Sequence, residues 1–537
     1  MLAMQHKESL VSSLARTCLP LAVACSGASP VPPGAPAAAR PEGLVASLAV
    51  TVESGQLSGG SGEDRAIAVF KGIPYAAPPV GDLRWRPPQP PPAWAGVRAA
   101  TTFGKSCMQE LRRSFLPWTE EFMLRNDVSE DCLTLNLWVP AMAPGNPGAQ
   151  LPVLVYVHGG AFNSGSGEVL LYDGEELAQQ GIIVVTLNYR LGVFGFLCHP
   201  ELSLESSEHS SGNYGLLDQI SALAWVKRNI AAFGGDPGNV TVAGQSAGAA
   251  AVHHLTQSPL AQALFQRAIA QSGPWNRHTP TSTRAEAEAR GLEFAAGASL
   301  LDLRSLSAQA LLAQQTKSAA RFRPVVDGWV IPEQLRALAA RGALADVPLL
   351  TGITADERSS QSDYGKLSRE QLAQLVRSEY GDQADAVLAL YPAASDSEAG
   401  ARQRELLRDT GLATLLDCRR MRAQHGKSKD FGYLFERAIP WPEHPEYQAF
   451  HSAELPYVFH NLSKLDRPWQ DSDHRLAELM SSYWVNFIRH GDPNGEGRPE
   501  WPSNAEQVMR LGVEPRAELA LETEKAALLL KRFEREP

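Results

Sequence analysis

The sequence predicts an α/β fold, in which a large and mostly parallel sheet is flanked by helices. Two uninterrupted apolar runs, at 153–157 and 182–187, are typical of strands that are covered on both faces. A helical stretch at 173–180 separates them, which makes a parallel crossover unit. A further β-branched run, at 239–243, leads into the pentapeptide Gly-Gln-Ser-Ala-Gly at 244–248. Alternating strands and helices of this kind predict a doubly wound mixed sheet.

The N-terminal residues 1–25 are predicted to be a secretory signal peptide. A polar, weakly basic segment precedes a short apolar run at 19–24, which is far shorter than the roughly 20 apolar residues of a membrane span. We therefore expect a periplasmic or secreted protein. Small residues before Cys25 also resemble the processing site of bacterial lipoproteins, so lipid anchoring at Cys25 is an alternative. The Pro- and Ala-rich residues 26–43 are expected to form a tether without a core.

A single catalytic domain is predicted for residues 44–537, because no change of composition marks a boundary within them. A strand at 68–75 runs into a Pro-rich loop, and the alternating residues 133–139 predict a half-exposed strand. Helical periodicity continues on both sides of the pentapeptide. We expect further helices at 216–229, 249–255, 284–296, 333–340, 369–380 and 475–490, and further strands at 348–351, 432–435 and 508–511.

Composition limits the class of protein and its partners. Hydrophobic residues make up 44% and charged residues 20% of the chain, which is typical of a soluble globular protein. The formal net charge of −10 argues against nucleic acid as a partner, since nucleic acids attract basic surfaces. Nucleic acid is therefore not an expected partner, whereas a small-molecule substrate is.

Ser246, at the centre of the pentapeptide, is the candidate nucleophile. The pattern G-x-S-x-G lets a strand turn sharply into a helix, which leaves the serine Oγ exposed at the turn. The flanking residues suit both elements, because a buried strand precedes the motif and a helix-compatible stretch follows it. A chance match in a chain rich in Gly and Ser is the alternative, so a base, an acid and oxyanion donors must also be found.

Residues 158–162, His-Gly-Gly-Ala-Phe, are the candidate source of oxyanion donors. They follow the buried strand 153–157 at the carboxyl edge of the sheet, where α/β proteins place their sites. Glycine permits the close approach and unusual dihedral angles that turn backbone N–H groups outward. Hydrolases use such a loop together with the N–H after the nucleophile, here Ala247. A plain glycine-rich turn is the alternative.

Cys107 and Cys132 enclose a polar loop that contains aromatic residues. In an exported protein such a pair is expected to form a disulfide.

Long segments of the chain resemble the signatures of the type-B carboxylesterase family, which also contains the cholinesterases. Residues 233–236 and 244–248 follow that family's serine signature, and residues 130–137 follow its second signature. The resemblance runs from residue 44 almost to the end and points to bacterial, para-nitrobenzyl-esterase-like members. It implies an α/β-hydrolase fold with helical insertions over the site. Further matching landmarks lie at 70–75, 188–190, 491–495 and 501–502.

This resemblance implies catalytic roles for residues far apart in the chain. Glu357 ends a segment similar to the family's acid motif, and His451 lies in a segment similar to its histidine motif. With Ser246 they would form a catalytic triad in the order serine, acid, histidine that α/β-hydrolases have. Such a triad needs no metal or organic cofactor. The resemblance also implies that the oxyanion donors are the N–H groups of Gly160, Ala161 and Ala247, and that Arg84 with Glu130 and Arg190 with Asp218 form structural ion pairs.

Four positions depart from the family's pattern. Gln245 stands before the serine where Glu is common, which removes a negative charge from the site. Ala161 replaces a glycine. Because the oxyanion donor is a backbone N–H, the added methyl group should be tolerated unless the residue needs a positive φ. Phe122 occupies the position of the tryptophan that holds choline in cholinesterases, with Trp118 four residues earlier. Arg358 follows the acid in place of Gly, where it is expected to pair with a carboxylate or to narrow the entrance.

The expected function is serine hydrolysis of neutral, small to medium carboxylic esters in preference to choline esters. Loss of the charge at Gln245 and displacement of the aromatic ring both weaken a site for a cation. A shift of Trp118 into the ring's place is the alternative at that point. An amidase or carbamate hydrolase with the same triad, and a non-catalytic binding member of the fold, are the alternative functions.

Overall fold

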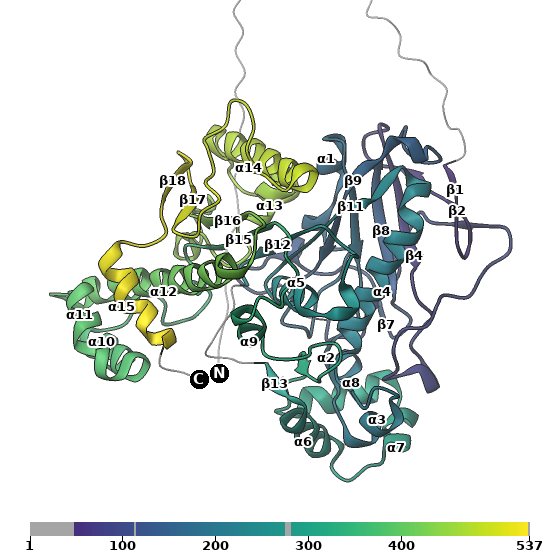
Figure 1. Ribbon diagram of the computed structural model, residues 1–537, viewed down its shortest axis with the longest axis horizontal. Coiled ribbons are helices and arrows are strands. Elements are labelled where there is room, and N and C mark those ends of the chain that lie inside the picture. Colours follow the sequence, from purple (N-terminus) through teal and green to yellow (C-terminus); the bar gives the residue numbers. More distant parts are fainter. Residues whose placement is uncertain (1–47, 112–113, 274–280, 535–537) are drawn as a thin grey trace, which may run out of the picture. The chain divides into compact units, whose positions relative to one another are not determined.

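A mixed sheet of eleven strands forms the centre of the fold (Figure 1). The computed structural model describes residues 48–111, 114–273 and 281–534. Seven neighbouring strands run parallel and the outer ones are antiparallel, which confirms the predicted α/β class. From edge to edge the order is β18 (Arg516–Leu519), β17 (Gln507–Leu511), β16 (Asp430–Phe435), β15 (Leu349–Thr354), β12 (Arg267–Gln271), β11 (Gly235–Gln245), β9 (Leu151–Val157), β10 (Ile183–Leu187), β8 (Thr134–Pro140), β4 (Ile67–Pro74) and β3 (Gly60–Ser61).

The remaining elements are short strands and helices around this sheet. The short strands are β1 (Ala49–Val52), β2 (Gly55–Ser58), β5 (Val97–Ala99), β6 (Ser106–Cys107), β7 (Val128–Ser129), β13 (Ser282–Thr283) and β14 (Val325–Val326). The helices are α1 (Glu175–Gln179), α2 (Gly192–Phe196), α3 (Pro200–Glu205), α4 (Tyr214–Asn229), α5 (Ala247–Gln257), α6 (Arg284–Ala295), α7 (Leu300–Ser305), α8 (Ala308–Lys317), α9 (Leu335–Ala340), α10 (Arg369–Tyr380), α11 (Ala384–Leu390), α12 (Asp396–His425), α13 (Leu455–Val458), α14 (Asp471–His490) and α15 (Thr523–Glu534).

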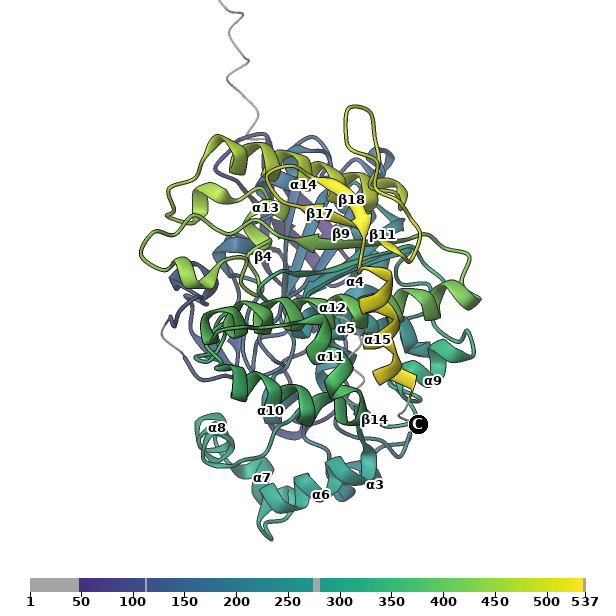
Figure 2. The ribbon, with the colours of Figure 1, turned by 90° about the vertical axis from the view of Figure 1, so that its left-hand side faces the viewer.

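Strand β11, which carries the pentapeptide at its end, lies in the middle of the sheet between β9 and β12. Along β9 the side chains alternate between two cores, as the pleat of a strand requires. Val155 packs in the cluster that contains residues of α4 and α5, whereas Tyr156 packs in the cluster that contains residues of α13 and α14. Figures 1 and 2 show these two pairs of helices on opposite faces of the sheet. Coverage on both faces explains the uninterrupted apolar runs.

Strand β8 differs from the expectation of a half-exposed strand. It lies inside the sheet between β10 and β4, and its central residues are buried on both faces. The polar residue of its alternating pattern, Asn136, is itself buried and satisfied. Its Oδ1 accepts from the N–H of Gly72 at 3.0 Å, and its Nδ2 donates to Thr186 at 3.0 Å. A paired buried polar group therefore imitates the pattern of a solvent-facing one.

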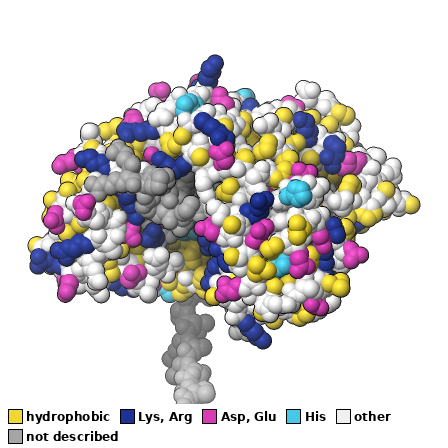
Figure 3. Space-filling model, turned by 60° about the horizontal axis from the view of Figure 1, so that its bottom comes forward, with side chains coloured by type: hydrophobic (Ala, Val, Ile, Leu, Met, Phe, Trp, Pro, Cys, Tyr) yellow, Lys and Arg dark blue, Asp and Glu magenta, His cyan; other side chains and the backbone are white. Residues whose placement is uncertain are grey.

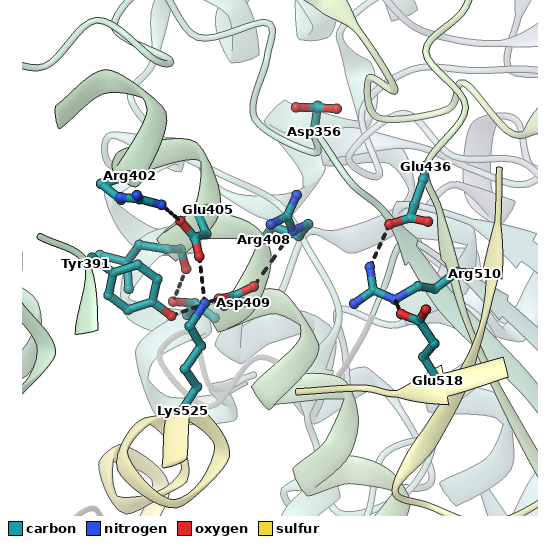
Figure 4. Close-up of polar contacts among 12 residues, drawn as sticks. Asp356, Tyr391, Arg402, Glu405, Arg408, Asp409, Glu436, Arg510, Glu518 and Lys525 are labelled. Atoms are coloured by element: carbon teal, nitrogen blue, oxygen red, sulfur yellow. Dashed lines mark hydrogen bonds and ion pairs between the residues drawn. The ribbon is translucent and has the colours of Figure 1, made fainter. Parts of the chain in front are cut away.

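Helix α12 was not among the predicted helices, although it spans 30 residues. Its inner face carries polar side chains that are buried in hydrogen bonds and ion pairs, so its apolar periodicity is weak. Asp409 accepts a hydrogen bond from the Tyr391 hydroxyl at 2.9 Å and forms an ion pair with Lys525 of α15, also at 2.9 Å (Figure 4). Lys525 also contacts Glu405 at 2.6 Å. This network fastens the C-terminal helix to α12.

The disulfide between Cys107 and Cys132 is present and closes the loop between them. Both expected ion pairs are also formed, with Arg84 2.6 Å from Glu130 and Arg190 2.7 Å from Asp218. Disulfides persist in oxidising compartments.

The predicted signal peptide, the tether and Cys25 lie within residues 1–47, outside the described residues. Among the described helices, none is both long and apolar enough to cross a membrane.

Candidate active site

The pentapeptide forms a tight turn between β11 and α5. Ser246 has φ +59° and ψ −122°, a conformation that L-residues rarely adopt and that costs about 1–3 kcal/mol. A Cβ on Gly244 would lie 2.5 Å from the backbone of Gly248, and a Cβ on Gly248 would lie 2.1 Å from the carbonyl oxygen of Val157. Only glycine fits at either position. The turn is the strained elbow that the motif predicts.

The structure brings Ser246, His451 and Glu357 together from three segments. Ser246 lies between β11 and α5, Glu357 follows β15, and His451 precedes α13. The Oγ of Ser246 lies 2.8 Å from Nε2 of His451, and Nδ1 of His451 contacts Oε2 of Glu357. Proton transfer from the serine to the imidazole therefore needs no rearrangement, and the carboxylate holds the tautomer whose Nε2 is free to accept.

The imidazole of His451 and the carboxyl group of Glu357 each shift the pKa of the other. Burial lowers the pKa of His451, but the charge and the hydrogen bond of Glu357 outweigh it and hold that pKa above its ordinary value. Burial raises the pKa of Glu357, but the imidazolium charge and hydrogen bonds outweigh it and lower that pKa. The pair is thus arranged to stabilise a protonated His451 beside an ionised Glu357.

Asp356 joins the loop that carries Glu357 to the loop that carries His451. Its N–H donates to the carbonyl oxygen of Ala449 at 3.1 Å, and its carboxylate accepts from the N–H of Ala449 at 3.2 Å. The Tyr364 hydroxyl donates to the other carboxylate oxygen at 2.7 Å. Two segments more than 90 residues apart are therefore held in register beside the site.

The loop 158–162 lies against the elbow in a conformation suited to donating N–H groups. A Cβ on Gly159 would lie 2.7 Å from the carbonyl oxygen of Gln245. Within the part of the chain that the structure describes, the N–H groups of Gly160, Ala161 and Ala247 have no acceptor. Ala161 has φ +55°, so its backbone lies in the left-handed region that favours glycine. This conformation costs an L-residue about 1–2 kcal/mol. The alanine at this position therefore does adopt a positive φ, the one case in which replacing glycine was expected to be unfavourable.

A cavity of about 630 Å³ opens onto Ser246. That volume suits a small-molecule ligand, for which pockets of about 300–1,000 Å³ are usual. The loop enclosed by the disulfide supplies aromatic walls, because Trp118 and Phe122 both line the cavity. The Trp118 ring packs edge-on to His451, with 6.4 Å between ring centroids, and its Nε1 lies 3.3 Å from Oγ of Ser452. Trp118 thus reaches the site despite its shift in sequence.

Of two further positions that depart from the family's pattern, Gln245 lies in the site and Arg358 lies outside it. Gln245 is buried, and its Nε2 lies 3.2 Å from Nε2 of His451. A neutral amide therefore touches the base directly. Arg358 is exposed, does not line the cavity and forms no ion pair with a described carboxylate, so neither expectation for it is met.

The variant Gln245→Glu is expected to move the acid limb of the pH profile of kcat/KM to higher pH by about one unit. A carboxylate in contact with His451 favours the imidazolium and so raises its pKa, and the base works only when neutral. The pH dependence of neutral-ester hydrolysis measures this shift. Gln245→Met, which adds no charge, is the control, and coincident limbs in Gln245→Glu and Gln245→Met would contradict the expectation.

Glu454 is a site residue that the sequence analysis missed. It is fully buried three residues after His451, and Nε2 of Gln271 donates to it at 3.2 Å. Burial and the nearby charge of Glu357 raise the pKa of Glu454 to about 7. Its charge also raises the pKa of His451. The three-residue spacing from His451 was the available signal.

Among the described residues, no group of three His, Cys, Asp or Glu side chains could hold a metal ion.

Comparisons with known proteins identify the family. The sequence model of the carboxylesterase family matches residues 46–529. The chain belongs to this family. It is 40% identical over 467 residues to a fumonisin B1 esterase of Sphingopyxis macrogoltabida, covering 84% of this chain and 83% of the relative. It is 38% identical over 481 residues to the para-nitrobenzyl esterase of Bacillus subtilis (strain 168), covering 86% and 93%.

More distant comparisons agree with this carboxylesterase assignment. A cocaine esterase of Homo sapiens is 32% identical over 518 residues, with 88% of this chain and 89% of the relative covered. A solved structure of a PNB esterase superposes with a TM-score of 0.74 at 34% identity, covering 90% of this chain and 99% of that one. These findings confirm the resemblance, the α/β-hydrolase fold and the assignment of the chain as a carboxylesterase.

Proposed function

We propose that this carboxylesterase cleaves carboxylic esters through a covalent acyl-enzyme on Ser246. The observation that carries the proposal is the hydrogen-bonded chain from Ser246 through His451 to Glu357 at the strained elbow. A nucleophile bonded to a base, which a third group orients, is the arrangement that acyl transfer requires.

In the first step Oγ of Ser246 attacks the ester carbonyl carbon, and Nε2 of His451 takes the hydroxyl proton. The carbonyl oxygen becomes an oxyanion, for which Gly160, Ala161 and Ala247 are the proposed donors. The tetrahedral intermediate then collapses as the bond to the alcohol oxygen breaks. His451 returns the proton to that oxygen, so a neutral alcohol leaves and an acyl group remains on the serine.

In the second step water replaces the alcohol. His451 takes a proton from the water as its oxygen attacks the acyl carbon, and the same donors stabilise the second oxyanion. Collapse breaks the bond to Oγ and returns the proton to Ser246. The carboxylic acid is released and the enzyme is restored, with no oxidant, metal or cofactor consumed.

Neutral esters with small to medium acyl chains are the proposed substrates, in preference to choline esters. The argument is electrostatic, because Gln245 places an amide where a carboxylate would attract a quaternary ammonium. Trp118 supplies an aromatic ring at the cavity, so the preference depends on the missing charge rather than on a missing ring.

A panel of p-nitrophenyl esters of increasing chain length, with butyrylthiocholine as the cationic ester, tests this preference. We expect the kcat/KM of the best neutral ester to exceed that of the choline ester by at least about tenfold, as the loss of one favourable charge contact predicts. A matched anilide in the same panel separates an esterase from an amidase. Faster turnover of the choline ester would refute the proposed preference.

Export is part of the proposal. The apolar run at 19–24 and the disulfide between Cys107 and Cys132 both support an oxidising compartment outside the cytoplasm. Mass spectrometry of the mature N-terminus, after expression in a bacterial host, tests cleavage near residue 25 and shows whether Cys25 carries lipid. An uncleaved N-terminus in the cytosolic fraction would refute export.

A further inference from the structure

Two arginines, Arg321 and Arg323, line the cavity that contains Ser246. They lie on the segment between α8 and β14. Phe322 between them is buried and packs edge-on against Phe294 of α6, with 5.1 Å between ring centroids, and Pro324 after them is also buried. In this alternating stretch the buried side chains face the core, so both arginine side chains stand on the opposite, exposed side. The packing of Phe322 thus leaves Arg321 and Arg323 together on one exposed side, and both residues line the cavity.

Among the residues that the structure describes, no carboxylate forms an ion pair with these two cations. Neither arginine forms an ion pair or a side-chain hydrogen bond within the described residues. The cavity lining has one acidic side chain, Glu110, and it accepts a hydrogen bond from Thr316 at 2.8 Å. The chain as a whole has a formal charge of −10, and on the face that Figure 3 shows, basic and acidic side chains are interspersed. The excess of positive charge at the cavity is therefore a local feature.

The charges of the cavity are arranged by depth of burial. Gln245, beside the nucleophile, is buried and uncharged, whereas Arg321 and Arg323 are exposed. A carboxylate pays a large desolvation penalty in a buried site but little at a wet rim. Guanidinium groups bind carboxylates through paired hydrogen bonds, which favours them over a point charge. An ester whose scissile carbonyl lies at Ser246 could keep a free carboxylate at the rim.

We propose that the enzyme prefers esters that carry a free carboxylate at a distance from the scissile bond, with Arg321 and Arg323 holding that carboxylate. Monoesters of dicarboxylic acids have this chemistry. The inference rests on the proposed ester hydrolysis at Ser246 and narrows its substrates, because esters with a free carboxylate would be cleaved faster than the neutral esters of equal length proposed above. The two arginines are specificity residues, and they take no part in bond making or breaking.

The test compares two substrates that differ only in charge. One series contains mono-4-nitrophenyl esters of linear dicarboxylic acids from succinic to suberic acid. The matched series has the free carboxylate replaced by a primary amide. The ratio of kcat/KM, acid form over amide form, isolates the charge from the serine chemistry. It is measured in the wild type, in Arg321→Gln/Arg323→Gln, and in Arg228→Gln/Arg516→Gln, which removes two half-exposed arginines that do not line the cavity.

At the chain length that reaches the rim, we expect a ratio of about 3–30 in the wild type, because each exposed ion pair contributes up to about fivefold. The ratio should fall to about one in Arg321→Gln/Arg323→Gln, persist in the control, and decrease between 10 mM and 1 M salt. A ratio of one in the wild type at every length, or a ratio that survives in Arg321→Gln/Arg323→Gln, would overturn this inference while hydrolysis of the amide series left the proposed function standing. Failure to hydrolyse either series would overturn the proposed function, and this inference with it.

Discussion

Replacing Ser246 with alanine is expected to lower kcat for ester hydrolysis by about 10⁶-fold, the loss found where such triads have been taken apart. The Oγ of Ser246 is the candidate nucleophile at the elbow, and it lies 2.8 Å from Nε2 of His451. Without it no acyl-enzyme forms, and His451 can at best activate water directly. The oxyanion donors remain, so a residual rate above that of the uncatalysed reaction is expected.

Burst kinetics with a p-nitrophenyl ester and labelling by a fluorophosphonate probe measure this loss independently. The variant should show neither a burst nor a label. Ser378→Ala, which removes an exposed hydroxyl on helix α10 outside the cavity, is the control and should retain both. Circular dichroism establishes that each variant is folded. Ester hydrolysis at the wild-type rate in Ser246→Ala would remove the serine from the mechanism and revive a non-catalytic role for the elbow.

The central strands could be predicted because burial on both faces leaves a direct trace in the sequence. The uninterrupted apolar runs at β9 and β10 are short, as strands are, and rich in β-branched residues, which favours strands over buried helices. The same rule failed for β8, where Asn136 is buried but paired, and for α12, whose buried face contains Asp409 and Arg419. Local patterns report whether a side chain is apolar, whereas burial also depends on partners that only the fold supplies.

The candidate triad could be named from motifs because acyl transfer fixes both the residue types and their surroundings. Other features of the site depend on contacts between distant segments. Trp118 reaches His451 because the loop closed by the disulfide lines the cavity, and Glu454 is buried near the base, at the start of α13. Arg321 and Arg323 carry no motif at all. Their position follows from the burial of Phe322, and no sequence period identifies which cavity they would face.

The variant Glu357→Gln is expected to lower kcat by about 10³–10⁴-fold, which is the scale of loss when the acid of a triad becomes an amide. Gln preserves the size of the side chain but presents an N–H₂ group as readily as an oxygen to Nδ1 of His451. The imidazole can then hold its proton on Nε2, where it no longer accepts the proton of Ser246. Loss of the carboxylate also removes the charge that stabilises the imidazolium formed during attack.

The same variant should move the acid limb of the pH profile to lower pH, the direction opposite to that expected for Gln245→Glu. Glu357 holds the pKa of His451 above its ordinary value, so removing its charge lowers that pKa and leaves the base neutral at more acidic pH. The residual kcat/KM of Glu357→Gln, measured from pH 5 to 9, gives the position of the limb. A reduced rate with an unshifted limb would mean that Glu357 only orients His451, whereas a shifted limb with little loss of rate would mean that its charge is dispensable for the chemistry. Only the two changes together support a carboxylate that both fixes the tautomer and stabilises the cation.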